Sequence, residues 1–94
     1  MKISVIGGGY VGVELGSVYA STGSSVTMVE MTDGLLPGVD RDLVRILKKR
    51  LDDKFETILL NTTVEEAREE KTGLKVTLKS YGSYSQTQTF DRVL

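Results

Sequence analysis

The stretch that decides the fold begins with KISVIGGGYVG at residues 2–12 and closes with VTMVE at residues 26–30. Its first apolar run predicts a buried strand, and three consecutive glycines then mark a turn. A helical pattern follows from about Tyr10 to Thr22, and the second apolar run ends at the acid Glu30. This order of strand, glycine turn, helix, strand and acid is typical of a dinucleotide-binding unit.

The glycines of the turn have separate expected roles. Gly7 lets the chain leave the strand in a conformation that a Cβ would obstruct. Gly9 lets the backbone approach a pyrophosphate closely, and Gly12 lets the helix pack tightly on the strands. The amides of the first helical turn then point at the phosphates, aided by the positive end of the helix dipole. We therefore expect the cofactor to contact Gly7, Gly8, Gly9, Tyr10, Val11 and Gly12.

Glu30 is the candidate that selects the cofactor. It lies 23 positions after Gly7, where a carboxylate can accept hydrogen bonds from the adenosine ribose hydroxyls. The same charge would repel the 2′-phosphate of NADP, and no Lys or Arg occurs between Glu30 and Arg41 to attract it. We therefore predict NAD rather than NADP, with Met31 as a neighbouring candidate.

Composition narrows the chemistry that the chain can perform. The 94 residues make one small domain, which we place over residues 1–94, and the net charge of -1 argues against a nucleic-acid surface. No cysteine or histidine is present, which excludes disulfides, thiolate or imidazole metal sites and histidine-activated nucleophiles. The apolar runs are too short for a membrane helix. We expect a cytoplasmic protein with no catalytic residue and no metal site of its own.

Apolar spacing predicts how the two helices pack. In the first helix, Val11, Leu15 and Val18, with Tyr19, form the expected core face. Gly16, one turn beyond Gly12, either extends the close packing or is a tolerated helix glycine. The second helix is expected to begin after an N-cap at Asp40 and to run to about Lys54. Its apolar positions fall at helical spacing, at Leu43, Val44, Leu47 and Leu51.

The character of the sequence changes after Asn61. Residues 55–60 predict a third strand, 63–67 a short strand, and 65–71 a charged stretch that leads to a turn at Thr72-Gly73. Leu74, Val76 and Leu78 alternate with polar residues, which is typical of a half-buried antiparallel strand. Residues 81–87 read as a loop and 88–94 as a further strand, so the sequence stops in mid-strand. We expect a domain taken from a longer protein.

Three longer stretches extend the pattern beyond the glycine turn: residues 5–16, 23–31 and 34–44. Together they resemble the NAD-binding domain of dihydrolipoamide dehydrogenases, which are flavoprotein disulfide reductases, and residues 60–64 and 90–94 extend the likeness. The resemblance implies an α/β, Rossmann-like three-layer domain. Its short parallel sheet would carry two helices, and a small antiparallel β-meander would replace one crossover helix.

The resemblance also implies roles for single residues. Tyr10 would shield the flavin and move when nicotinamide arrives, and Glu14 would sit beside the nicotinamide and pair with a lysine of the flavin domain. Glu30 would hold the adenosine ribose, and Val64 would contact adenine through its backbone. Gly12 in the third glycine position fits users of NAD, whereas NADP relatives often carry alanine there.

The family also needs parts that these residues do not supply. They are an FAD domain, a redox-active cysteine pair, and a histidine–glutamate couple from the partner subunit. The expected partners are therefore NAD(H), the other domains of a parent flavoprotein, its homodimer mate and a 2-oxoacid dehydrogenase complex. FAD would be bound in the parent by a domain outside this sequence.

Three other interpretations stay open. The opening residues also resemble a nucleotide-sugar dehydrogenase, although the likeness fades by Glu14. A regulatory Rossmann module that senses NAD fits the missing catalytic groups, and an FAD-binding domain uses the same glycine turn. Tyr10 and Glu14 favour the NAD copy of the motif over the FAD copy.

Overall fold

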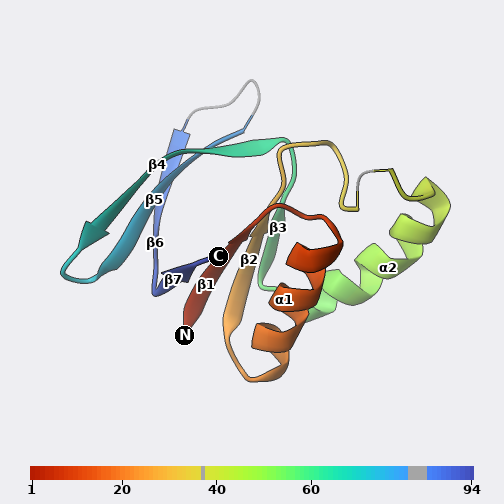
Figure 1. Cartoon of the computed structure of the whole chain (residues 1–94), viewed down its shortest axis with the longest axis horizontal. Helices are drawn as coiled ribbons and strands as arrows, with labels where there is room; N and C mark the ends of the chain where they lie inside the picture. The colour runs from red at the N-terminus through yellow and green to blue at the C-terminus, as the bar shows by residue number, and fades with distance from the viewer. Residues whose placement is uncertain (37, 81–84) are drawn as a thin grey trace.

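The computed structural model describes residues 1–36, 38–80 and 85–94, apart from the side chain of Tyr10, and it folds in three layers (Figure 1). The predicted class, an α/β Rossmann-like domain with a β-meander, is confirmed. In chain order the elements are β1 (Lys2–Ile6), α1 (Tyr10–Ser21), β2 (Ser25–Val29), α2 (Arg41–Lys54), β3 (Thr57–Leu59), β4 (Thr62–Glu70), β5 (Gly73–Ser80), β6 (Ser85–Phe90) and β7 (Arg92–Val93).

The middle layer is a parallel sheet with the strand order β3-β2-β1-β7. The β-branched residues of β1 pair with β2 on one side, where Ile3 is opposite Val26, and with β7 on the other, where Ile3 is opposite Arg92. The N–H of Lys2 also donates to the Asp91 carboxylate across a 2.7 Å contact. Strand β1, which carries the glycine turn, is therefore held between the second and the last strand of the chain.

Both helices cover one face of this sheet. Alternate residues of β1 and β2 point toward them, so Ile3, Val5, Val26 and Met28 form a buried cluster with side chains from α2 and the 34–36 segment. Gly16 lies at the closest approach, because a Cβ there would come within 3.0 Å of Phe55 and 3.3 Å of Met28. Its role in close packing is confirmed.

The opposite face of the sheet is covered by an antiparallel meander of β4, β5 and β6. Val76, Leu78 and Phe90 are buried there against Val29, with Val64 partly buried beside them. The register of β4 on β5 shifts between Val64 and Glu66, and such a bulge changes the direction in which the neighbouring side chains point. The domain thus has two apolar cores, one on each face of the parallel sheet.

The predicted core face of α1 is wrong for three of its four residues and is confirmed for Tyr19. The side chains of Val11, Leu15 and Val18 are 67%, 42% and 61% exposed. The face that touches the sheet carries small residues, Gly12, Gly16 and Ala20, with Tyr19 partly buried beside them. Gly12 and Gly16 bring the helix close to its neighbours, Val13 also packs against the core, and Val11, Leu15 and Val18 lie outside.

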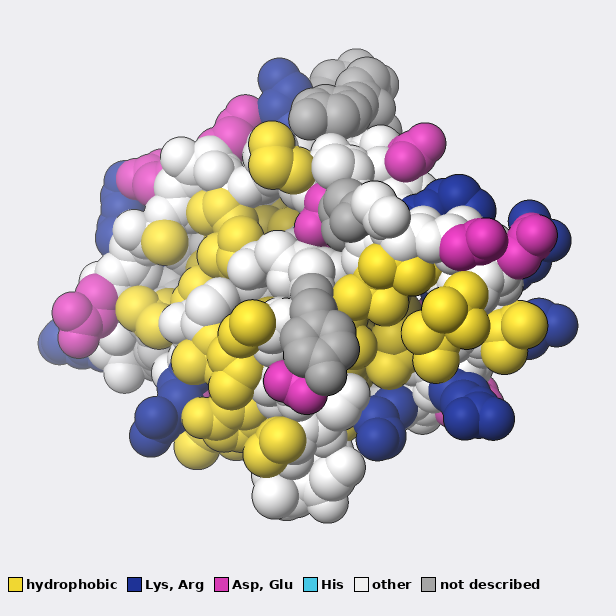
Figure 2. Space-filling model, turned by 45° about the vertical axis from the view of Figure 1, so that its right-hand side comes forward, with side chains coloured by type: hydrophobic (Ala, Val, Ile, Leu, Met, Phe, Trp, Pro, Cys, Tyr) yellow, Lys and Arg dark blue, Asp and Glu magenta, His cyan; other side chains and the backbone are white. Residues whose placement is uncertain are grey.

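The second helix follows its prediction more closely. Asp40 caps it by accepting a hydrogen bond of 2.8 Å from the N–H of Asp42. Val44 is buried and Leu47 and Leu51 pack against the core, whereas Leu43 is 51% exposed and does not belong to the buried face. Figure 2 shows hydrophobic side chains exposed on this side of the molecule, over both helices.

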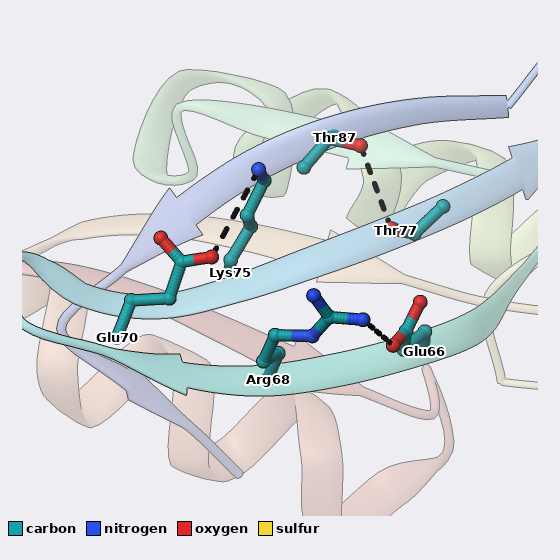
Figure 3. Close-up of polar contacts among 6 residues, drawn as sticks. All are labelled: Glu66, Arg68, Glu70, Lys75, Thr77 and Thr87. Carbon is teal, nitrogen blue, oxygen red and sulfur yellow. Dashed lines mark hydrogen bonds and ion pairs between the residues drawn. The ribbon is translucent and has the colours of Figure 1, made fainter.

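The charged stretch 65–71 leads to a turn as predicted, at residues 71–72, but the strand before the turn extends beyond the predicted end at Ala67. Strand β4 continues to Glu70, which is opposite Gly73 of β5, and pairs of opposite charge lie along the two strands (Figure 3). Arg68 contacts Glu66 at 2.6 Å and Lys75 contacts Glu70 at 3.9 Å. These exposed pairs contribute less than about 1 kcal/mol each. The hairpin therefore owes its length mainly to backbone pairing.

The last part of the meander also differs from the prediction. Residues 85–87 belong to β6 rather than to a loop, and they pair with residues 77–79 of β5. The other residues of the predicted loop, 81–84, lie outside the described part of the chain, as does Pro37 in the 32–39 segment. Strand β6 ends at Phe90 and the chain bends at Asp91 before β7.

Candidate functional site

The glycine turn joins the end of β1 to the start of α1. Gly7 has φ +99°, a conformation that L side chains rarely adopt, and its N–H donates to Val29 O at 2.7 Å. A Cβ on Gly12 would collide with Gly7 O. Gly7 therefore meets a conformational requirement and Gly12 a packing requirement of the protein itself.

Gly9 meets neither requirement. Its φ of -76° and ψ of -174° are open to any residue, and a Cβ added there would find no protein atom within 4 Å. It is also the N-cap of α1 and offers no side-chain hydrogen bond, and the first intrahelical bond is from Val13 N to Gly9 O. The N–H groups of Tyr10, Val11 and Gly12 have no partner within the helix. The turn thus presents an open space in front of backbone donors at a positive helix end.

Glu30 follows directly after β2, and its carboxylate reaches back to the turn. Oε1 accepts a hydrogen bond from Gly8 N at 2.7 Å, and Oε2 accepts from Thr32 N at 2.8 Å and from Thr32 Oγ1 at 2.6 Å. The residue is 5% exposed. Burial alone would raise the pKa of this carboxyl, but the hydrogen bonds from Thr32 and Gly8 favour the charged form and hold the pKa below its ordinary value. Glu30 is an ionised and oriented acceptor at the mouth of the turn.

A groove of about 520 Å³ begins at this carboxylate. It lies at the carboxyl ends of β1 and β2, where ligands of open α/β sheets bind. The structure brings four predicted residues together along it: Gly7, Glu30, Met31 and Val64. Sequence reasoning missed the other lining residues, which are Ile6, Val29, Thr32, Thr62 and Thr63.

Two features of the sequence could have identified some of these residues. Thr32 lies two positions after the acid, a spacing at which a hydroxyl or an amide readily bonds a nearby carboxylate. Thr62 and Thr63 come directly before Val64, which had been predicted already. Ile6 and Val29 are strand ends, and nothing in their type distinguishes them from core residues.

Glu14 lies apart from this groove. It is exposed on α1 and lines a separate hollow of about 550 Å³ with Val11, Leu15 and Val18. The structure therefore does not bring Glu14 or Val11 to the groove that holds Glu30. The side chain of Tyr10, which was predicted to shield a flavin, lies outside the described part of the structure.

Comparisons with known proteins agree with this geometry. Residues 2–86 match the family model described as pyridine nucleotide-disulphide oxidoreductase. A dihydrolipoyl dehydrogenase of Vibrio parahaemolyticus is 37% identical over 93 residues, which are 99% of this chain and 19% of that protein. The chain thus spans about a fifth of the length of this relative.

Solved structures give the same result. The HOCl-induced flavoprotein disulfide reductase RclA of Escherichia coli superposes with a TM-score of 0.81 at 32% identity, over 99% of this chain and 20% of that one. A water-forming NADH oxidase of Lactobacillus brevis, solved with NADH bound, has a TM-score of 0.80 at 28% identity, over 98% of this chain and 20% of that one. Within the residues that the structure describes, no helix has the length and apolar character needed to cross a membrane.

Proposed function

Because the chain belongs to the pyridine nucleotide-disulphide oxidoreductase family, we propose that it is the NAD-binding domain of a dihydrolipoyl dehydrogenase. Bound nicotinamide would accept a hydride from FAD during dihydrolipoamide oxidation. The sequence contains no Cys or His, so the disulfide and the acid–base groups of such a reaction belong to other parts of a parent enzyme. The chain's own contribution is to bind and orient the dinucleotide.

The observation that carries this proposal is the 2.7 Å hydrogen bond from Gly8 N to Glu30 Oε1. It holds the carboxylate beside the glycine turn, so that one ligand could meet both. An ionised carboxylate has about four lone-pair positions, and Gly8 and Thr32 occupy three of them. About one position is left for a ribose hydroxyl, in a groove whose far side is lined by Val64.

Gly9 supports the pyrophosphate part of the proposal. Neither its backbone conformation nor its protein neighbours require a glycine. A ligand that approaches the backbone closely does require one, because a Cβ would occupy the space beside the amides of Tyr10 and Val11. The residues of the turn therefore fit a bound pyrophosphate.

The charges around the groove favour NAD over NADP. Among its described lining residues Glu30 is the one with a charged side chain. Arg41 is the first cation along the chain after Glu30, and it is directed at the backbone carbonyls of Leu35, Leu36 and Val39.

The roles of the remaining candidates are part of the proposal. Met31 and Val64 would border the adenosine, with the backbone of Val64 against adenine. Tyr10 and Glu14 would serve the nicotinamide end, where Glu14 would pair with a lysine of the flavin domain. The exposed apolar side chains of Val11 and Leu15 beside Glu14 are consistent with contact to further domains of a parent flavoprotein.

Larger partners stay predictions as well. They are the homodimer mate, a 2-oxoacid dehydrogenase complex and FAD bound by another domain, together with a cytoplasmic location. The sensor and nucleotide-sugar dehydrogenase alternatives gain no support from the comparisons.

Calorimetric titration of the 94-residue chain with NAD⁺, NADP⁺, FAD and ADP-ribose tests the assignment. We expect NAD⁺ and ADP-ribose to bind with similar affinity, because the glycine turn, Glu30 and Val64 would all contact the ADP-ribose half. NADP⁺ should bind at least about tenfold more weakly, since one charge–phosphate repulsion of about 1.4 kcal/mol gives that factor. Tighter binding of NADP⁺ or FAD would refute the proposal.

A matched pair of variants tests the part played by Glu30. Replacing Glu30 with Gln should weaken NAD⁺ binding and narrow the gap to NADP⁺, because the amide neither repels a phosphate nor attracts the ribose hydroxyls as strongly. Replacing Glu69, an exposed acid of β4, with Gln changes the net charge equally and should alter neither affinity. An unchanged preference in Glu30→Gln would remove Glu30 from the proposed site.

A further inference from the structure

The segment between β2 and α2 forms the floor of the glycine turn. Leu35 is 1% exposed, and its side chain fills the space beneath Gly8, where a Cβ would lie 2.5 Å from Leu35 Cδ2. The N–H of Leu36 donates to Gly8 O at 2.7 Å. Because Gly8 N already donates to Glu30, both backbone polar groups of Gly8 are occupied. The turn is thus fixed from two sides, by Glu30 and by the 35–36 segment.

The 35–36 segment is itself held in an unfavourable conformation. Leu36 has φ +50°, the left-handed region that a branched residue rarely enters without support from its surroundings. Its side chain is buried in the core between the helices and the sheet. Interactions with this backbone offset the cost of its conformation.

Arg41 supplies such interactions. Its guanidinium, on the first residue of α2, turns back to the segment and donates to Leu35 O at 3.1 Å, to Leu36 O, and to Val39 O from both Nε at 3.0 Å and Nη2 at 2.9 Å. A planar fork of five donors can make these four contacts at once, whereas an ammonium has three donors on a single nitrogen. A cation at the amino end of a helix is otherwise unfavourable, so these carbonyls account for its position.

We propose that Arg41 is a positioning residue for dinucleotide binding. It fixes the carbonyls of Leu35 and Leu36, the N–H of Leu36 then fixes Gly8, and the amides of the following residues are held ready for the pyrophosphate. Arg41 touches no part of the ligand. The inference rests on the proposed function, and it assigns to the first cation after Glu30 a role other than attraction of a 2′-phosphate.

The experiment uses Arg41→Gln, which removes the charge and most of the fork, and Arg45→Gln as the control. Arg45 lies on the same helix, its side chain is 74% exposed and it contacts Asp42 at 3.3 Å, so both variants change the net charge equally. Calorimetry should show the Kd for NAD⁺ raised about tenfold in Arg41→Gln, within the usual range of coupling between sites. It should stay at the wild-type value in Arg45→Gln, and Arg41→Lys should fall between the two.

Amide hydrogen exchange separates positioning from a general loss of stability. In Arg41→Gln we expect faster exchange at Leu36 and Gly8, while amides in the middle of β2 and α2 keep their protection. Faster exchange throughout the domain would mean that Arg41 acts on global stability, and the proposal would be wrong.

Three binding results would also overturn the proposal. Equal NAD⁺ affinity in wild type and Arg41→Gln would overturn this inference alone. Loss of NADP⁺ affinity with NAD⁺ affinity retained would identify Arg41 as a phosphate ligand instead. Failure of the wild-type chain to bind NAD⁺ would overturn the proposed function first and this inference with it.

Discussion

Replacement of Glu30 with Gln tests the central feature of the site without any ligand. In one orientation the amide oxygen would accept from Thr32, and its NH₂ group would then face the N–H of Gly8. The buried N–H of Gly8 is then left without an acceptor, which costs about 1–3 kcal/mol. The two hydrogen bonds from Thr32 also change from charge-assisted to neutral. The burial of a charge, which opposes folding, is lost at the same time. We expect a net loss of about 2 kcal/mol at neutral pH, or roughly 10 °C in Tm for a domain of this size.

The direction of the pKa shift of Glu30 decides how this loss of stability changes with pH. The native pKa of Glu30 lies below its ordinary value of 4.5, so the unfolded chain binds a proton at a pH where the native chain does not. The contribution of the carboxylate to stability is therefore complete above the ordinary pKa. It is lost as pH falls through the lower native pKa. The difference in unfolding free energy between wild type and Glu30→Gln should shrink over that window.

Urea unfolding followed by circular dichroism measures this difference from about pH 7 to about pH 3. The control is Glu69→Gln, which changes an exposed acid on β4 and should leave the wild-type stability curve in place. A difference for Glu30→Gln that stays constant across the range, or grows toward low pH, would refute the hydrogen-bonded carboxylate described here.

The remaining predictions concern the turn and the groove. Gly9→Ala should leave the Tm unchanged, because the added Cβ meets no protein atom. The same variant should weaken NAD⁺ binding in calorimetry at least about tenfold. A lower Tm with unchanged affinity would contradict this prediction. Gly12→Ala should instead destabilise the domain by about 1–3 kcal/mol in urea unfolding, because the Cβ collides with Gly7 O. Thr32→Val removes one hydroxyl donor from Glu30 and should lower the unfolding free energy by about 1–2 kcal/mol. Titration followed by nuclear magnetic resonance should find the pKa of Glu30 raised. An unchanged pKa would mean that the hydroxyl does not stabilise the charged carboxylate.

The part of the site closest to the backbone was predictable from sequence. Gly7 and Gly12 are required by conformation and by packing, and these requirements act over a few residues. Asp40 is a local signal of the same kind, because its side chain caps a helix two residues on. Glu30 could be placed because a strand of known length fixes where its last residue lies. The sequence was sufficient to predict each feature that depends only on a few neighbouring residues.

The misplaced features depend on contacts between distant residues. The spacing of Val11, Leu15 and Val18 is that of a core face, but the inner face of α1 is set by how closely the helix approaches Met28 and Phe55. The strand predicted over 63–67 ended too early, because its extension to Glu70 depends on pairing with residues 73–75 of β5. The hydrogen bonds from Arg41 to the carbonyls of Leu35, Leu36 and Val39 have no sequence signature, since any cation just after a helix N-cap would look the same.

The position of β1 between β2 and β7 has a consequence for how the chain acquires its structure. Residues 2–4 pair along one of their two edges with residues 91–94, which lie far from them in the sequence. The hairpins β4–β5 and β5–β6 join neighbouring residues and form rapidly, whereas a closure that spans nearly the whole chain is slow. Until that closure occurs, the strand that carries the glycine turn has an open edge, which is the part of a folding intermediate most prone to pair with another molecule. Conditions that slow the last step, or variants that weaken β7, should therefore reduce the yield of soluble protein before they alter any property of the folded site.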